Sequence, residues 1–399
     1  MGSQDCEEMR LDVVELLKEL VRVKSLPGSE GELANVVKEF LGRAGVDKVF
    51  IDSVGNVIAP VRGGGLGIIV VEGHLDTVDV GDLSQWVVDP FSGAVIDGRV
   101  YGRGTVDMKG SIASQIKALE DLKTLESDIY VVYTVHEEII EGVALRHALR
   151  DSLRIRPDVV VTGEATSLEL GLGHRGRAVI DLEISGVSAH ASMPGEGINS
   201  LEGAALAILK VVEASNNLPA HELLGSESAT ATLIECWPKI QPQIPDKCLV
   251  TVDHRVLPGR SEADIMRVYE DVCNHVKDLK NAGCRPSLRV EEVKSWRDYP
   301  LHTKEFFSGW INEDENLIKP LMRTLKKMYS SVSRHYWRFS TDLVIVNEFD
   351  AAGLGLGPGK EALAHKPNEY VEVAELRKAV DMYRVMLREI SNYLSSKIK

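Results

Sequence analysis

The sequence predicts an α/β protein built on a mostly parallel sheet, into which a smaller α+β unit of ferredoxin-like type is inserted. The first half of the chain alternates apolar strand-like segments with helical segments, an order typical of layered α/β domains. From about Gly176 the order of elements becomes β-α-β-β-α-β, which is typical of a compact α+β unit. A chain of 399 residues is also longer than one domain usually is.

The elements of the first part follow from hydrophobic periodicity. Two helices are predicted within residues 8–45, because Val13, Leu16 and Leu17 recur at helical spacing and Pro27-Gly28 then interrupt the pattern. We interpret Gly63-Gly64-Gly65 as a turn between strands, since a strand and not a helix follows them. The other predicted elements are strands at 48–52, 57–61, 67–72, 129–135 and 158–161, and helices at 111–122 and 142–152.

The second part has its own pattern. The predicted α+β unit consists of strands at 178–184, 230–234, 248–255 and 287–293, and helices at 200–214 and 262–279. Residues 294–316 look irregular and are expected to return the chain to the first domain. Helices at 317–328 and 373–397 then complete that domain, so the predicted boundaries are 1–175 and 295–399 for the main domain and 176–294 for the insertion.

Composition excludes several classes of protein. Lys and Arg number 46 and Asp and Glu number 60, so the formal charge of −14 disfavours nucleic acid as the main partner. No stretch reaches 18 apolar residues, and the acidic N-terminus does not resemble a signal peptide, so we expect a cytoplasmic protein without a membrane span. The five cysteines include no C-x-x-C pair, and reduced thiols are therefore expected instead of disulfides or a cysteine zinc site.

Residues 67–76 place a histidine at the end of an apolar strand. Their sequence is G-I-I-V-V-E-G-H-L-D, so His74 follows the strand and Asp76 lies two residues later. Residues i and i+2 of an extended chain point the same way, so Asp76 can bond one imidazole nitrogen while the other nitrogen binds a metal. A surface histidine near a loop aspartate is the alternative interpretation of this segment alone.

Four more segments present candidate ligands. In Y-G-R-G-T-V-D-M-K-G (101–110), Asp107 precedes a helix, where it could bridge two cations or cap the helix. The strand 129–135 leads into Glu137 and Glu138, of which one could bind a metal while the other faces a substrate water, unless both form a solvated charge pair. Glu164 follows another strand in G-E-A-T, and the loop L-A-H-K-P-N-E-Y presents His365.

Together these segments predict a two-metal site at the strand ends of one sheet. Mixed histidine and carboxylate ligands favour Zn²⁺, with Co²⁺ or Mn²⁺ as alternatives, over Ca²⁺. Two divalent ions exceed the charge of the three carboxylates Asp107, Glu138 and Glu164, and the remaining positive charge would acidify a water molecule. Glu137 is then placed to take the proton and pass it to the leaving amine.

In this order, the segments resemble the M20 family of metal-dependent aminoacylases, carboxypeptidases and deacetylases over nearly the whole chain. The resemblance includes the S-A-H-A-S-M-P motif at 188–194 and the late A-H-K-P. It implies a metal-dependent hydrolase domain with an inserted lid that also forms a homodimer. It further implies that Asp76 orients a histidine, that Glu137 is the general acid/base, and that the metal ligands are His74, Asp107, Glu138, Glu164 and His365, with Asp107 bridging.

Two assignments, those of His190 and Arg255, depend on the resemblance. It implies that His190 stabilises the oxyanion, often in the active site of the partner subunit, although a surface histidine is the simpler interpretation. Arg255, in V-D-H-R, resembles the arginine that binds the substrate carboxylate, and Arg175 or Arg177 could share that task. Many members have an asparagine three residues before a Pro-Asp pair, whereas this sequence has Pro242 at that place and Gln243 beside it. The segments G-H-R-G-R and W-V-V-D-P-F are most similar to the subgroup called selenium-metabolism hydrolases.

The expected function is a two-metal hydrolase that cleaves the amide bond of an N-acyl amino acid or a short peptide with a free carboxylate. Its partners would be a small-molecule substrate and a second copy of the chain. A catalytically inactive binding protein on the same scaffold is the first alternative, and a metal-dependent phosphohydrolase is the second. The second alternative does not account for the inserted S-A-H-A-S-M-P segment.

Overall fold

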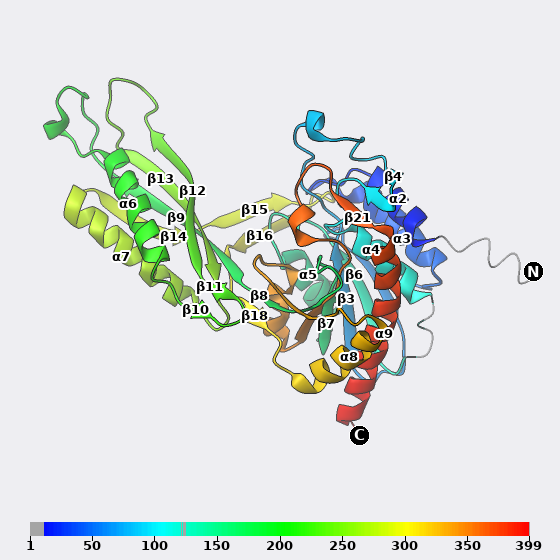
Figure 1. Cartoon of the computed structure of the whole chain (residues 1–399). Helices are drawn as coiled ribbons and strands as arrows, with labels where there is room; N and C mark the ends of the chain where they lie inside the picture. Colours follow the sequence, from blue (N-terminus) through cyan, green and yellow to red (C-terminus); the bar gives the residue numbers. More distant parts are fainter. Residues whose placement is uncertain (1–11, 121, 123–124, 399) are drawn as a thin grey trace, which may run out of the picture.

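The computed structural model describes residues 12–398 except 121, 123 and 124, and arranges them in two lobes (Figure 1). The larger lobe is built on a nine-stranded sheet of order β1-β2-β6-β3-β7-β20-β8-β18, with β19 paired to β8. Its strands are β1 (Phe50–Ile51), β2 (Val57–Val61), β3 (Ile68–His74), β6 (Asp128–Thr134), β7 (Val159–Thr162), β8 (Leu170–His174), β18 (Trp310–Ile311), β19 (Arg334–Trp337) and β20 (Ala352–Gly355).

The centre of this sheet is parallel. Strands β6, β3, β7 and β20 run in one direction, whereas β2 and β8 flank them in the antiparallel sense. Ile69, Val70 and Val71 on β3 are all buried, as expected for a strand covered on both faces. This arrangement confirms the predicted α/β class with a mostly parallel sheet, and it brings the carboxyl ends of the central strands to one edge.

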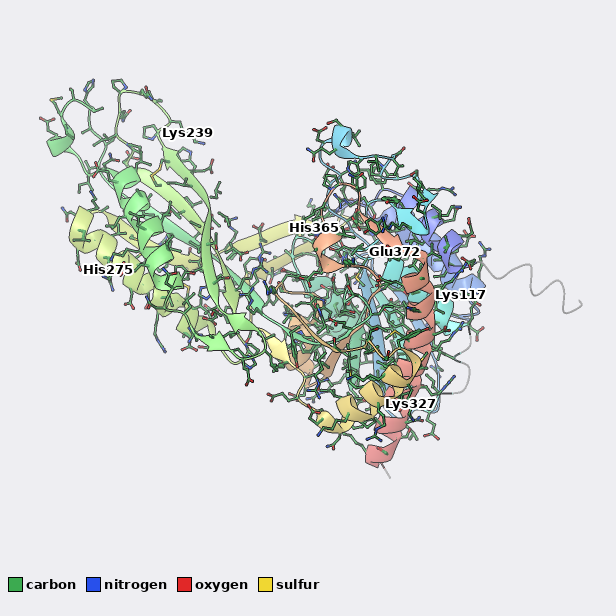
Figure 2. The ribbon with its side chains drawn as sticks, in the orientation of Figure 1. Lys117, Lys239, His275, Lys327, His365 and Glu372 are labelled. Carbon is green, nitrogen blue, oxygen red and sulfur yellow. A yellow bond between two sulfur atoms is a disulfide. The ribbon has the colours of Figure 1, made fainter. Side chains whose placement is uncertain are left out.

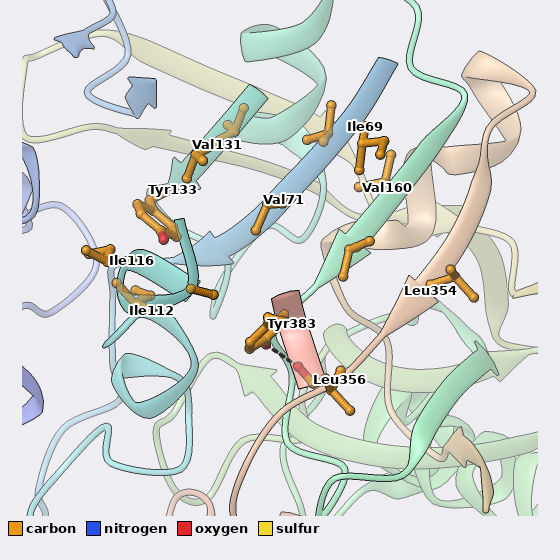
Figure 3. Packing of buried hydrophobic residues seen from close by; sticks show 14 of the residues in the cluster. Ile69, Val71, Ile112, Ile116, Val131, Tyr133, Val160, Leu354, Leu356 and Tyr383 are labelled. Atoms are coloured by element: carbon orange, nitrogen blue, oxygen red, sulfur yellow. Dashed lines mark hydrogen bonds between the residues drawn. The ribbon is translucent and has the colours of Figure 1, made fainter. Parts of the chain in front are cut away.

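Helices cover the sheet of the larger lobe. Helix α4 (Lys109–Leu119) packs against α9 (Val373–Ile398) and α2 (Val13–Arg22), and α8 (Glu315–Met328) packs against α9. Figure 3 shows Ile112 of α4 near Tyr133 of β6, and Tyr383 of α9 near Leu356, whose carbonyl accepts a hydrogen bond from the Tyr383 hydroxyl. The remaining helices of this lobe are α3 (Gly31–Arg43) and α5 (Val143–His147), and α5 continues into a π-helical turn at Ala148–Leu153.

The smaller lobe contains a separate antiparallel sheet of order β12-β13-β9-β14, formed by β9 (Gly176–Ser185), β12 (Ser228–Trp237), β13 (Lys247–Val256) and β14 (Gly283–Leu288). Helices α6 (Ser200–Ser215) and α7 (Glu262–Lys280) pack against it around a second buried cluster that includes Ile180, Val250 and Tyr269. The chain order β-α-β-β-α-β matches the predicted one. The opposite face carries polar residues such as Arg177 and Asp253, which alternate along the strands with buried ones.

The connection back to the larger lobe is more regular than predicted. The strand expected at 287–293 is divided between β14 and β15 (Val290–Lys294), and β15 forms a hairpin with β16 (Pro300–Lys304). A short strand β17 (Phe306–Phe307) then pairs with β9 before the chain enters β18. The alternation of single polar and apolar residues here was too short to reveal these strands.

The expectation of reduced cysteines is wrong. Cys236 of β12 is bonded to Cys248 of β13, and Cys273 of α7 is bonded to Cys284 of β14. The first pair lies directly opposite in the antiparallel register, and the second joins a helix to the strand beneath it. The spacings of 12 and 11 residues gave no local signal, because only the register brings each pair together. Cys6 lies outside the described residues.

Candidate metal centre and active site

The carboxyl edge of the parallel strands carries most of the predicted site. His74 is the last residue of β3, Glu137 and Glu138 follow β6, and Glu164 follows β7. Because neighbouring parallel strands end at the same edge, these side chains converge although they are far apart in the chain. Asp107 precedes α4, and His365 comes from the loop after the turn Glu361–Leu363, facing the region between the lobes (Figure 2).

Asp107 lies at the centre of the cluster. Its Oδ1 is 2.8 Å from Nε2 of His74, and its Oδ2 is 3.1 Å from Nε2 of His365. The His74 Nε2 is also 3.7 Å from Glu164, and the His365 Nε2 is 3.1 Å from Glu138. The five predicted ligands therefore form two groups that share Asp107, as a bridging carboxylate requires.

Asp76 acts differently from the sequence-based expectation. The Nδ1 of His74 lies 2.9 Å from the main-chain carbonyl oxygen of Asp76, whereas the carboxylate is 3.7 Å away. The carboxylate instead accepts hydrogen bonds from the main-chain amides of Glu137 and Glu138, at 3.1 and 3.0 Å. Asp76 thus fixes both the imidazole of His74, through its main chain, and the turn that presents the two glutamates.

Burial of these carboxylates favours the presence of positive charge near them. Burial is the main cause that raises the pKa of Glu164, and the nearby Asp107 raises it further. Burial likewise raises the pKa values of Glu137 and Glu138. Hydrogen bonds to Asp107 and Glu138 raise the pKa of His365 to about 10, because both carboxylates lie beside its Nε2.

The donor set fits divalent cations. One atom from each of His74, Glu137 and Glu164 can be chosen so that all lie within 4.8 Å of one another, and the same holds for His74, Asp107 and Glu138. Imidazole nitrogens and carboxylate oxygens at this density are the ligands that zinc and related metals use. Since the Nδ1 of His74 faces a carbonyl, its Nε2 is the nitrogen left for a metal.

A cavity of about 400 Å³ opens beside this cluster at the junction of the two lobes. Besides Asp107, Glu137, Glu138, Glu164 and His365, its wall is formed by Glu141, Arg177, Arg255, Phe339, Ser340, Glu361 and Ala364. Glu137 is only 7% exposed, which suits a proton-transfer group held away from bulk water. The cavity therefore combines a cation-binding edge with a buried carboxyl group.

Two predicted residues lie away from this cavity. Arg175 donates to the main-chain carbonyls of Ser226 and Arg338, at 2.6 and 2.9 Å, and is absent from the cavity wall. His190 is exposed in the loop before α6 and pairs with Gln243, in the loop that contains Lys239 at the outer end of the smaller lobe (Figure 2). Arg255 does line the cavity, as predicted for a substrate-binding residue.

Sequence reasoning missed three buried acids that support the site. Glu369 accepts hydrogen bonds from the amides of Val106 and Asp107, at 2.8 and 3.2 Å, and forms an ion pair with Arg103 at 2.6 Å. Asp342 accepts from the Thr134 hydroxyl at 2.7 Å. Burial raises its pKa to about 6. The third acid is Glu141, which accepts a hydrogen bond from the Ser340 hydroxyl. Glu369 closes the motif that contains His365, so its position after that loop was the one available signal.

Comparison with known proteins agrees with this geometry. The family model described as Peptidase family M20/M25/M40 matches residues 70–389. The uncharacterised protein YgeY of Escherichia coli is 29% identical over 390 residues, covering 95% of this chain and 94% of its own. Acetylornithine deacetylase of Buchnera aphidicola is 28% identical over 324 residues, 79% of each chain.

A solved structure shares the fold. The M20 family metallo-carboxypeptidase Sso-CP2 from Sulfolobus solfataricus superposes with a TM-score of 0.76 at 17% sequence identity. The match covers 96% of this chain and all of the other. At that identity the likeness concerns the fold alone.

Proposed function

Because the chain belongs to peptidase family M20/M25/M40 and is thereby a metal-dependent amide hydrolase, we propose that it cleaves N-acyl amino acids or short peptides with a free carboxylate. The observation that carries this proposal is the convergence of the five predicted ligands with the buried Glu137 beside one cavity. The similarity to an acetylornithine deacetylase supports an acylated amino acid as substrate.

We assign one ion to His74, Asp107 and Glu164, and a second to Asp107, Glu138 and His365, in line with the two groups of contacts. Zinc is the metal that this donor set favours, with cobalt or manganese as alternatives. When bound, such ions polarise the scissile carbonyl and lower the pKa of water.

Glu137 is proposed as the general acid/base. Its main-chain amide is fixed by Asp76, its side chain lines the cavity, and burial raises its pKa, which makes the carboxylate a better proton acceptor. In this role its carboxylate takes a proton from the attacking water and returns it to the amide nitrogen as the C–N bond breaks.

His190 fits a role in a partner subunit better than one in its own. Arg177, at the start of β9, lines the cavity, whereas His190 follows the other end of this ten-residue strand. At about 3.3 Å per residue the strand spans roughly 30 Å, which is too far for a side chain to reach. We therefore propose that His190 stabilises the oxyanion of a second copy.

The smaller lobe offers a surface for that second copy. Strand β12 is an edge strand, and Leu233, Ile234 and Trp237 on it are exposed. Helix α6 also exposes Leu209 and Val212, at 66% and 55%. Exposed apolar residues along an unpaired edge are typical of an interface, and we propose a two-fold dimer through β12 and α6.

Mixing of subunits tests this arrangement. Inactive His190→Ala and inactive Glu137→Gln chains should regain part of the activity when mixed, because a heterodimer has one site with both residues intact. The measurement is hydrolysis after proven subunit exchange, with each variant alone as the control. Absence of recovery would remove His190 from action in trans.

A cytoplasmic location is also proposed. No helix among the described residues is long and apolar enough to cross a membrane. The two disulfides argue against a cytoplasmic location, since cytosolic proteins seldom keep disulfides except in hyperthermophiles. Thiol titration of protein isolated under alkylating conditions would show whether both bonds exist in the cell.

A hydrolysis screen tests the proposed function. The chain is loaded separately with Zn²⁺, Co²⁺ and Mn²⁺ and given N-acetyl and N-succinyl amino acids and dipeptides, and products are identified by mass spectrometry. Cleavage by the wild type, retained by Glu270→Gln on the exposed side of α7 and lost in Glu137→Gln, supports the proposal. Equal activity of the two variants would contradict it.

A further inference from the structure

Part of the cavity wall is made of charged and polar residues that are not among the proposed metal ligands. Glu141 and Ser340 come from the larger lobe, and Arg177 and Arg255 come from β9 and β13 of the smaller lobe. This part of the wall therefore spans the junction of the lobes. Any group of the substrate beyond the scissile amide must lie against it or leave the cavity.

The two arginines of this wall already have acidic partners. Arg255 Nε lies 2.8 Å from Asp253, and its Nη2 donates to the same carboxylate at 3.2 Å. Arg177 Nε donates to Asp253 at 3.1 Å, and its Nη1 lies 3.6 Å from Glu141 and 3.7 Å from Glu305. Three carboxylates thus surround two guanidinium groups.

The three carboxylates outnumber these two guanidinium groups, and Arg175 and Arg289 lie near enough to Asp253 and Glu305 to offset part of the difference. Glu305 is 2% exposed, and burial, followed by repulsion from Glu141, raises its pKa to about 7. Glu361 adds another carboxylate to the cavity wall and has His335 as its partner at 3.4 Å. The acidic side of this wall, at Glu141 and Glu361, is therefore better suited to a cation than to a further carboxylate.

Glu141 is the acid through which a cation can be bound. It is 8% exposed, and its Oε1 accepts a hydrogen bond from the Ser340 hydroxyl at 2.7 Å. Its Oε2 is buried and accepts no hydrogen bond, although Arg177 is near enough for a weak ion pair. A buried carboxylate oxygen without a donor is costly, and Glu141 is one of the residues that line the cavity, where a ligand could supply a donor.

We propose that Glu141, held by Ser340, binds a positively charged amino group of the substrate at a distance from the scissile amide. The inference rests on the proposed hydrolase function and narrows its substrate class to acylated amino acids or peptides that carry a free ammonium group. An ammonium group has three donors and can satisfy Glu141 while restoring the charge balance of the wall. Arg255 keeps unused donors for the substrate carboxylate.

Matched substrates test this inference on the metal-loaded full chain. Nα-acetyl-L-ornithine and Nα-acetyl-L-norvaline differ by the side-chain amino group, and L-alanyl-L-leucine and N-propionyl-L-leucine differ by the amino group on the acyl side. The wild type should prefer the amine-bearing member of at least one pair in kcat/KM by about tenfold or more, the size expected for a hydrogen bond to a charged group.

Variants show whether Glu141 causes the preference. Glu141→Gln should bring the ratio within the preferred pair close to one, and Ser340→Ala should lower it partly, whereas Glu270→Gln should keep it. Equal losses on both members of the pair would mean that Glu141 supports the fold only, and would overturn the inference. A wild type without preference in either pair would also overturn it.

A binding measurement separates this inference from the proposed function. The equilibrium affinities of L-ornithine and L-norvaline, and of L-alanyl-L-leucine and N-propionyl-L-leucine, are measured by calorimetry on metal-loaded Glu137→Gln. Tighter binding of an amine-bearing member supports the Glu141 site even if no substrate is hydrolysed, a result that would contradict only the proposed function. Equal binding within both pairs overturns the Glu141 site even if hydrolysis is observed.

Discussion

The carboxyl edge of the large sheet and the polar face of the smaller sheet both form the cavity, but they do so by different means. At the first, His74, Glu138 and Glu164 lie at or shortly after the end of a parallel strand, so the order of the strands brings them together. At the second, Arg177 and Arg255 gain their surroundings from the register of β9 and β13 and from residues of the other lobe. Local sequence therefore encodes the candidate metal site, and tertiary contacts encode the proposed substrate wall.

The largest effect is expected at the sheet edge. Glu137→Gln removes the proton acceptor without removing a proposed metal ligand, so kcat should fall by roughly 10²- to 10⁴-fold while metal content stays the same. Steady-state kinetics together with elemental analysis of the purified protein checks this. A variant that keeps full activity would exclude Glu137 from proton transfer.

The next effect concerns the support of Asp107. Glu369→Gln weakens the hydrogen bonds to the Asp107 backbone and leaves the buried Arg103 without its partner. We expect zinc affinity to fall about 10- to 100-fold, the usual result of disturbing the groups behind a metal ligand. Competition with a chromophoric chelator measures this affinity.

A matched control exists for that experiment. Glu372, labelled in Figure 2, forms an exposed ion pair with Arg99 at 2.9 Å. Glu372→Gln should leave zinc affinity unchanged, because surface pairs contribute at most about 1 kcal/mol and this one touches no proposed ligand. Equal zinc losses in both variants would show that Glu369 has no special role at Asp107.

The smallest effect is expected in the wall, as a dependence of stability on pH. Folding raises the pKa of Glu305 to about 7, so the folded chain keeps a proton that the unfolded chain releases above its ordinary value of 4.5. The stabilisation is thus complete below that value and is lost as pH rises through 7. Glu305→Gln should be more stable than the wild type at pH 8 by about 1–2 kcal/mol, with a smaller difference at pH 5.

Urea unfolding at the two pH values measures this difference, with Glu292→Gln on the exposed side of β15 as the control. An unchanged pH profile in Glu305→Gln would mean that Arg177 fully compensates this carboxylate. It would also weaken the case for an excess of negative charge in the wall.

The same contrast explains what could be predicted from the sequence. His74, Glu138 and Glu164 were found because each ends an apolar run, and the β-α-β-β-α-β order was found because its elements are long and periodic. Glu369 and Glu141 were not, since their partners Asp107 and Ser340 lie 262 and 199 residues away. The disulfide between Cys236 and Cys248 was also missed, because the spacing of the two residues in the sequence does not reveal the register of β12 and β13.

The proposed metal centre holds two ions at the sheet edge, with Asp107 shared between them. Equilibrium dialysis of the metal-free chain against Zn²⁺ tests it most directly, with the wild type and His365→Ala compared at the same pH. We predict about two tightly bound ions per chain for the wild type and about one for His365→Ala, because the group of His74, Asp107 and Glu164 remains intact. A wild type that binds at most one ion would contradict the proposed two-ion centre. A His365→Ala chain that still binds two ions would contradict the proposed role of His365 as a metal ligand.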